Sequence, residues 1–464
     1  MSGAGPVNRR TVRSCGAQDA FSFVAGRRRL SGQDWLGSSR PFVGPHRPVM
    51  PLSPSTDSTP STRRGLAALG VAHTLSALAD GIYFVALPWL TLEWTGSSAA
   101  LGGVLALAAL PRTLFMVVGG AWADRFAPRW LLAGSSFASA TVTALLAGAA
   151  MGWFGAPDAW VLYVAAAALG FVDAVAYPAA SALVPRLVAP ERLHRVNALL
   201  GALLQGAIFA GPAAAAGLLA WGGSAPTLAA SAAISVLAMG AALVIPRVSL
   251  SGSETASEAE ASDDHSAGTF DSIREGWAFV RHRPALLALI VLMGALNLAL
   301  AGPIIVGGAI LAEARFGGPE VFGLIVAAWG AGGLGGSVLA SLGTPRHVVG
   351  WMLASCALLA LGMAAWALPL ALGAVLAVTA GLGLVDSWLE IHANTWIQRQ
   401  TPLALQGRVM GLAMLVLVGL EPLSHVIAGG LVGWSLAGTF LIGATLTALA
   451  TGVAAWVMGR AQRT

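Results

Sequence analysis

The sequence predicts an all-α integral membrane protein with twelve transmembrane helices arranged in two pseudo-symmetric six-helix bundles. Three observations support this fold class: an apolar composition, regularly recurring apolar runs, and similar sequence patterns in the two halves of the chain. Of 464 residues, 56% are hydrophobic and only 10% are charged, and the mean hydropathy is +0.75. Because soluble domains carry roughly 25% charged residues, this composition excludes a water-soluble globule. The expected surroundings are a lipid bilayer.

Apolar runs of about 20 residues, the length that spans a bilayer, follow one another from residue 65 onward. They are expected to be helices, because lipid offers no partner for unpaired backbone groups. The twelve predicted spans are 66–92, 99–122, 130–151, 159–184, 196–220, 226–246, 285–311, 321–342, 347–366, 369–394, 409–432 and 436–458.

One long polar interruption divides these spans six and six. Residues 247–284 are polar, contain an acidic run, and are predicted to form a cytosolic linker. The N-terminal bundle is expected at 65–246 and the C-terminal bundle at 285–459, followed by a short cytosolic tail at 460–464.

The first 64 residues are rich in arginine, serine, proline and glycine and contain no long apolar stretch. Such a composition cannot bury enough apolar surface to fold, so we predict a disordered cytosolic tail. The alternative is that translation begins at Met50 and that residues 1–49 have no function.

Arginine placement predicts the orientation, since cytoplasmic loops retain positive charge. Gaps after even-numbered spans hold twelve arginines and gaps after odd-numbered spans hold only Arg315. We therefore expect a multi-pass protein of the cell membrane with both termini in the cytoplasm.

The composition also excludes several chemistries. All 26 basic residues are arginine, so a Walker A lysine and a lysine Schiff base are impossible. Ten of these arginines lie in the first 64 residues and most others lie between apolar runs, which argues against nucleic-acid binding. Gly330–Gly335 matches a dinucleotide fingerprint by spacing, but it lies inside an apolar run with no preceding strand. We therefore expect no cofactor, no metal and no nucleic-acid partner.

The two halves share local patterns, which indicates an internal duplication of the kind found in transporters. The fifth span opens on Arg195 and the eleventh on Arg408, each followed by a similar apolar pattern. The loop after the second span also aligns with the loop after the eighth. Because Ser341 stands where the first copy has Asp124, the two loops are not expected to be equivalent.

The end of the second span and the loop that follows it contain Gly119, Gly120, Asp124, Arg125 and Arg129. This pattern resembles the loop 2–3 signature of the major facilitator superfamily, Gly-x4-Asp-Arg/Lys-x-Gly-Arg/Lys-Arg/Lys, although its second glycine and one trailing basic residue are absent. The resemblance implies that Gly120, Asp124, Arg125 and Arg129 form a cytoplasmic gate motif. The alternative is that these arginines only set the topology.

A narrower resemblance covers residues 173–199, which look like the branch that contains macrolide-type and siderophore exporters. Gly211, Pro212 and Gly217 partly match the antiporter signature Gly-Pro-x-x-Gly-Gly, but alanines occupy two of its positions. The alternative interpretation is that these small residues only let helices pack closely.

Ionisable residues inside the predicted spans are expected to face a cavity or a partner, because a charge in hydrocarbon is costly. They are Asp80, Arg112, Asp173, Asp386, Glu390 and Glu421. The resemblance implies that the first, fourth, seventh and tenth helices line a central cavity. The predicted proton-coupling and cavity residues are Asp80, Arg112, Asp173, Asn297, Asp386 and Glu390. For each of them, a static ion pair or a hydrogen bond between helices is the alternative.

The resemblance implies a monomeric secondary active transporter that exports small amphiphilic molecules of the drug, macrolide or siderophore class in exchange for protons. Within the N-terminal half we expect Asp80 to carry the proton and Asp173 to be the partner of Arg112. An importer of a small metabolite on the same fold is the alternative. A membrane enzyme or sensor is disfavoured, because the sequence lacks His-Glu-x-x-His and Gly-x-Ser-x-Gly motifs and a soluble sensing domain.

Overall fold

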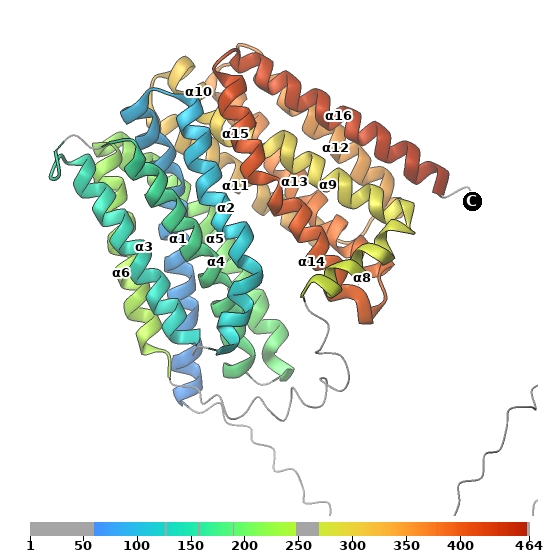
Figure 1. Cartoon of the computed structure of the whole chain (residues 1–464), viewed down its shortest axis with the longest axis horizontal. Helices are drawn as coiled ribbons and strands as arrows, with labels where there is room; N and C mark the ends of the chain where they lie inside the picture. Colours follow the sequence, from blue (N-terminus) through green and yellow to red (C-terminus); the bar gives the residue numbers. More distant parts are fainter. Residues whose placement is uncertain (1–59, 126–127, 156–157, 189, 247–268, 462–464) are drawn as a thin grey trace, which may run out of the picture. The chain divides into compact units, whose positions relative to one another are not determined.

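A computed structural model describes most of the chain, and every regular element within the described residues is a helix (Figure 1). The first compact unit, Met1–Asp57, lies outside the described residues, and all the helices belong to the second unit, Ser58–Thr464. Residues 1–59 of the predicted tail and most of the predicted linker therefore lie outside the described part. The last residues of the predicted tail, 60–64, are helical and begin α1. The described residues are 60–125, 128–155, 158–188, 190–246 and 269–461.

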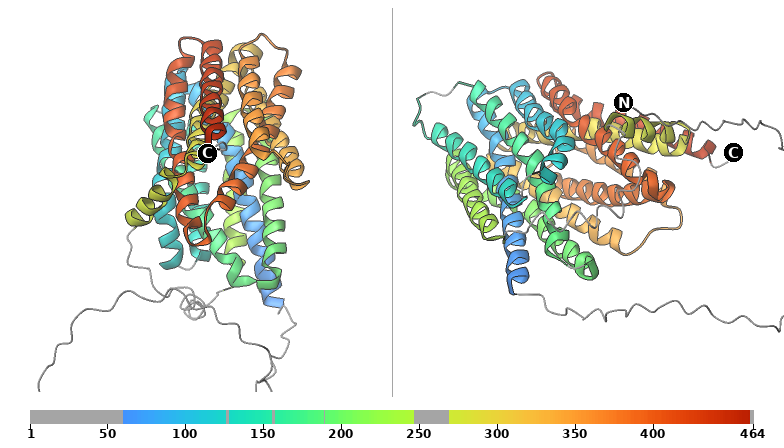
Figure 2. Two further views of the ribbon diagram at one scale, coloured as in Figure 1. Left: turned by 90° about the vertical axis from the view of Figure 1, so that its right-hand side faces the viewer. Right: turned by 60° about the horizontal axis from the view of Figure 1, so that its bottom comes forward.

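The N-terminal half contains six helices that correspond to the first six predicted spans. Two further views show the helices running alongside one another, with the connecting loops gathered at the ends (Figure 2). The six are α1 (Pro60–Thr95), α2 (Ser98–Arg125), α3 (Pro128–Ala150), α4 (Trp160–Leu187), α5 (Pro190–Gly222) and α6 (Ser224–Val244).

The C-terminal half repeats the six-span pattern with two of its spans interrupted. Its seventh span runs from α9 to η3 and its eleventh consists of α14 and α15. The elements are α8 (Thr269–Arg281), α9 (Pro284–Gly302), η2 (Pro303–Gly307), α10 (Gly308–Leu311), η3 (Ala312–Phe316), α11 (Pro319–Ser341), α12 (Val348–Trp366), α13 (Leu372–Gln400), α14 (Leu403–Gly419), α15 (Glu421–Val432) and α16 (Leu436–Ala461).

The predicted fold class is confirmed. Eleven stretches in the described part of the chain are long and apolar enough to cross a membrane, and α4 provides the twelfth through its apolar segment Trp160–Ala176. The predicted spans agree with the helices in order and approximate position. However, α1, α5 and α14 each begin six residues before the predicted span, and α13 ends six residues after it.

The segment predicted as a linker ends in a helix. Its last part forms α8, which packs on the C-terminal half through an ion pair between Glu275 and Arg408 of α14. A Cβ added at Gly276 would lie only 3.0 Å from the carbonyl oxygen of Arg408, so α8 lies close against α14.

Two spans of the C-terminal half depart from regular α-helix near mid-span. The seventh contains the π-helical segment η2, which begins at Pro303, and the eleventh is broken between Gly419 and Glu421. Pro422 follows the break, where its ring and missing N–H are incompatible with a continuous helix. π-Helical segments occur frequently at functional sites, and both irregularities border the cavities described below.

The two halves touch near one end of the helices, where α1 ends and α2 begins, which we call the far end. The other end, where α1 begins and α16 ends, is the terminal end. Ser98 donates a hydrogen bond to the carbonyl oxygen of Gly429 at 3.0 Å, and α2 and α15 lie side by side (Figure 1). A Cβ added at Gly102 would lie 2.5 Å from the carbonyl oxygen of His425. Small residues thus allow backbone contact between the halves.

The second contact between the halves joins α5 to α11 and also lies toward the far end. A Cβ added at Gly323, one turn into α11, would lie 2.7 Å from Ala216, close to the end of α5. Because both contacts lie on the same side, the space between the halves extends from them toward the terminal end.

Candidate functional site

The largest of the described cavities, about 790 Å³, lies between the two halves. Its walls come from α1, α2, α3, α4 and α5 on one side and from α9, η2, α11 and α14 on the other. Most of the lining is apolar, and its charged members are Asp80, Arg112 and Asp173. A cavity of this size falls in the range that holds a drug-sized molecule.

An ion pair crosses from one half to the other beside this cavity. Nη2 of Arg112, on α2, lies 2.5 Å from Oε2 of Glu421, the first residue of α15. Both side chains are partly buried, with exposed fractions of 36% and 18%. The break that begins α15 therefore places a carboxylate opposite the arginine of the other half.

The two aspartates of the N-terminal half have different surroundings. The hydroxyl of Tyr83 donates a hydrogen bond to Oδ2 of Asp173 at 2.7 Å. Asp80, one turn before Tyr83 on α1, lines the cavity, and among the described residues it has no hydrogen-bond partner. We expected Asp173 to be the partner of Arg112, whereas the structure pairs this arginine with Glu421.

The sequence analysis named Glu421 as an ionisable residue inside a span but did not include it among the site residues, and it did not select Tyr83, although signals for both exist. Tyr83 follows Asp80 by three residues and therefore shares its helix face. Glu421 precedes Pro422 in the middle of an apolar run, which is a signal for a helix break with a charge at the new helix start.

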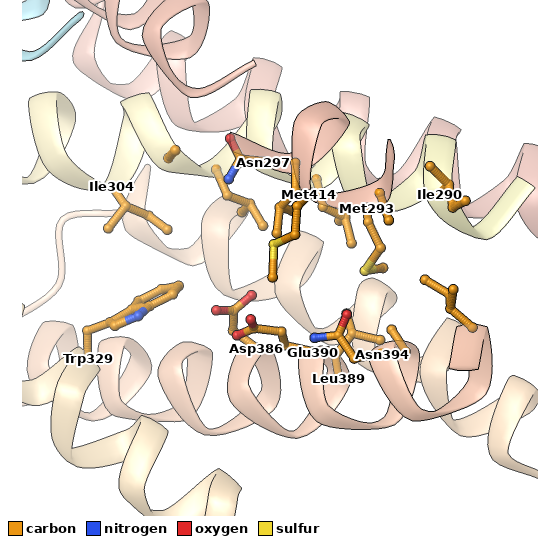
Figure 3. Close-up of a pocket in the computed structure, with 17 residues that line it drawn as sticks. Ile290, Met293, Asn297, Ile304, Trp329, Asp386, Leu389, Glu390, Asn394 and Met414 are labelled. Atoms are coloured by element: carbon orange, nitrogen blue, oxygen red, sulfur yellow. The ribbon is translucent and has the colours of Figure 1, made fainter. Parts of the chain in front are cut away.

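A second cavity, of about 220 Å³, lies within the C-terminal half (Figure 3). It brings together the three candidate residues of this half, with Asn297 from α9 and Asp386 and Glu390 from α13. Asn394, one turn beyond Glu390, also lines it and was not selected from the sequence. Figure 3 shows the two carboxylates pointing from α13 toward the side that carries Asn297.

The predicted gate motif is described only in part. Gly120, Asp124 and Arg125 lie in α2, in a stretch whose side chains are outside the described residues. Arg129, at the start of α3, donates hydrogen bonds to the carbonyl oxygens of Ile245 at 3.0 Å and Leu243 at 3.2 Å. Arg129 thus caps the C-terminal end of α6 within its own half.

The three residues of the predicted packing motif have different surroundings. Gly211 and Pro212 are buried, and a Cβ added at Gly211 would lie 2.8 Å from the Cα of Gly81 on α1. Pro212 also lines the central cavity. An added Cβ at Gly217 would meet nothing within 4 Å, so close packing does not require a glycine there.

A cavity between two six-helix halves built by duplication is the architecture of secondary transporters. A sequence model of the Major Facilitator Superfamily matches residues 69–420, and the chain belongs to this family. It is therefore a multi-pass membrane transporter rather than an enzyme, embedded in a lipid bilayer and built for a small-molecule substrate.

Characterised and uncharacterised relatives agree with this family. An uncharacterised MFS-type transporter, y4rN, of Sinorhizobium fredii is 28% identical over 401 residues, covering 83% of this chain and 93% of that protein. The multidrug efflux pump Tap of Mycobacterium bovis BCG is 28% identical over 392 residues, covering 80% of this chain and 88% of that protein.

Solved structures of transporters have a similar fold. A mutant of the nucleoside transporter NupG superposes with a TM-score of 0.70 at 12% identity, covering 85% of this chain and 99% of that one. A bacterial homologue of the lysosomal transporter Spinster, in an inward-facing and unoccupied conformation, gives a TM-score of 0.62 at 15% identity, covering 88% and 98%. At these identities the likeness concerns the fold alone.

Proposed function

We propose that this protein exports small amphiphilic molecules in exchange for protons by alternating access. The observation that carries the proposal is the central cavity, which is largely apolar, large enough for a drug-sized molecule, and bordered by carboxylates and a charge pair that joins the halves. The relationship to a protein named as a multidrug efflux pump supports the same direction and substrate class.

The orientation proposed from the arginines places the terminal end in the cytoplasm of a cell bounded by its plasma membrane. The halves touch at the far end, so in this orientation the cavity belongs to an inward-open state. A substrate that partitions into the cytoplasmic side would reach the cavity from there. Export then requires the far-end contacts to open and the terminal end to close.

Coupling is assigned to the N-terminal half. Asp173 is engaged by Tyr83 and Arg112 by Glu421, whereas the Asp80 side chain is directed at the cavity without a described partner. Asp80 is therefore proposed as the proton carrier. Antiport follows if the proton and the substrate favour opposite conformations, one inward-open and the other outward-open. Each ligand shifts the equilibrium between these conformations only by its differential affinity for them.

The experiment that tests this function measures substrate-driven proton movement in vesicles that contain the purified protein. A substrate is first chosen from a compound-susceptibility panel of cells with and without the gene, repeated with a protonophore. In Asp80→Asn, substrate binding is expected to persist while proton movement stops.

A matched control is Glu313→Gln, which changes an exposed acid of η3 that lines neither cavity. It is expected to transport normally. If proton movement persists in Asp80→Asn but stops in Asp386→Asn or Glu390→Gln, coupling belongs to the C-terminal half. If the protonophore has no effect on resistance, proton-driven export is excluded.

A further inference from the structure

The smaller cavity has an unusual concentration of oxygen ligands along one helix. Asp386, Glu390 and Asn394 follow one another at intervals of four residues on α13, so they share one face, and all three line the cavity. Figure 3 shows Asp386 and Glu390 side by side, both directed away from their own helix. Two ionised carboxylates one turn apart repel each other unless one of them binds a proton or a positive charge lies near them.

The protein supplies no such charge within the described lining of this cavity, which contains neither arginine nor histidine. Arg112, which lines the neighbouring central cavity, is held by Glu421. A carboxylate in a membrane interior normally has a partner. The missing partner is therefore expected to come from a bound molecule.

A second polar group of the cavity also lacks a partner. Oδ1 of Asn297 is buried without a hydrogen-bond partner among the described residues, while its amide nitrogen points into the cavity in Figure 3. A half-turn of the amide exchanges the two atoms, so Asn297 can present an acceptor to a ligand that donates hydrogen bonds. This observation is independent of the acidic pair on α13.

The cavity is too small for a whole drug-sized ligand but joins a larger one. Its volume of about 220 Å³ lies below the range of roughly 300–1,000 Å³ typical of ligand pockets. Four residues line both cavities, and they are Ala301, Ile304, Trp329 and Met414. A single ligand can therefore place one end in each, with the ring of Trp329 at the junction, where it can contact a cation.

We propose that the cavity around Asp386 and Glu390 binds the ammonium head group of an amphiphilic substrate whose apolar body occupies the central cavity. This inference rests on the proposed function, since it takes the central cavity as the substrate chamber, and it defines the substrate class as organic cations. Asn297 and Asn394 accept further hydrogen bonds from the head group.

The test is direct binding to the purified full-length protein in lipid nanodiscs. The probe is dansylcadaverine, a fluorophore that carries a primary ammonium on an alkyl stem. Its matched partner is the dansylamide with the same stem but no amine. In Asp386→Asn/Glu390→Gln, dansylcadaverine is expected to bind at least about tenfold more weakly, as loss of a charge-assisted contact predicts. The uncharged partner should bind within about twofold of its original affinity.

Glu313→Gln, the same type of change on an exposed acid outside both cavities, is expected to leave both affinities unchanged. Equal weakening of both probes in the double variant would overturn the proposal, because it would show a loss of cavity shape. Unchanged binding of dansylcadaverine would also overturn it, as would displacement of this probe by Na⁺ alone, which would assign the carboxylates to an inorganic ion. Since binding is measured without a proton gradient, a failure of proton-coupled export would leave this result intact.

Discussion

The two halves of the molecule balance their membrane-embedded charges in different ways. In the N-terminal half, Arg112 pairs with Glu421 of the other half and Asp173 is held by Tyr83. Asp80 of the same half faces the central cavity that lies between the halves. In the C-terminal half, Asp386 and Glu390 face a cavity whose described lining offers no cation. The two halves share the same arrangement of six spans but differ in the charged side chains that these spans carry and in the partners of those side chains.

This difference suggests a division of labour. Charges that are paired across the halves can respond to the relative movement of the halves, because that movement breaks or forms the pair. Charges that face only an internal cavity can respond to what enters it. We therefore propose that the pair of Arg112 and Glu421 responds to the movement of the halves. In the same proposal Asp80 carries the proton in the central cavity, and Asp386 and Glu390 recognise a cationic group in the smaller cavity.

The largest effect is expected from removing the charge pair that joins the halves. Arg112→Gln leaves Glu421 without its partner in a partly buried position. We expect this change to lower the free energy of unfolding by about 1 to 3 kcal/mol and to abolish transport. Thermal denaturation of the purified protein and uptake into vesicles measure the two effects.

The double variant Arg112→Gln/Glu421→Gln removes both charges and should recover most of the lost stability but not the transport. A double variant as unstable as Arg112→Gln would show that Arg112 stabilises its own half and that the cross-half pair contributes little.

The next largest effect on transport is expected from substitutions in the first copy of the loop motif, compared with the second copy. Asp124→Asn is expected to lower transport several-fold while membrane insertion persists, whereas Ser341→Ala should have little effect, since only the first copy keeps the aspartate. Vesicle transport, normalised to the amount of inserted protein, makes the comparison. Equal and mild losses in both variants would assign the first loop to topology alone.

Much of this fold follows from the sequence because apolar runs of bilayer length leave a chain few alternatives to helices. The positions of Asp80, Asp386 and Glu390 in cavities were also predictable, since each interrupts an apolar run. The partner of Arg112 was not, because it depends on which helices of the two halves meet. Arg112 and Glu421 are 309 residues apart, and a spacing of that length carries no local signal.

A smaller effect is expected where the halves touch at the far end. Gly102→Val would place side-chain atoms against the carbonyl oxygen of His425, which should weaken the contact between α2 and α15 without disturbing either half. A cysteine introduced at Ala77, in the central cavity, should then react faster with an impermeant thiol reagent added outside cells. An unchanged rate would mean that this contact does not keep the far end closed.

The smallest effect concerns packing within the N-terminal half, where two glycines of one motif have opposite surroundings. At Gly211 a Cβ would lie 2.8 Å from Gly81, and overpacking of this kind costs about 1 to 3 kcal/mol. At Gly217 a Cβ meets open space, so alanine should instead stabilise the helix by up to about 1 kcal/mol through its higher helix propensity. The melting temperature of purified Gly211→Ala should therefore fall and that of Gly217→Ala should rise slightly, with substrate binding retained in the latter. If Gly217→Ala lowered transport without lowering stability, Gly217 would act in the conformational change itself, and the motif would be more than a packing device.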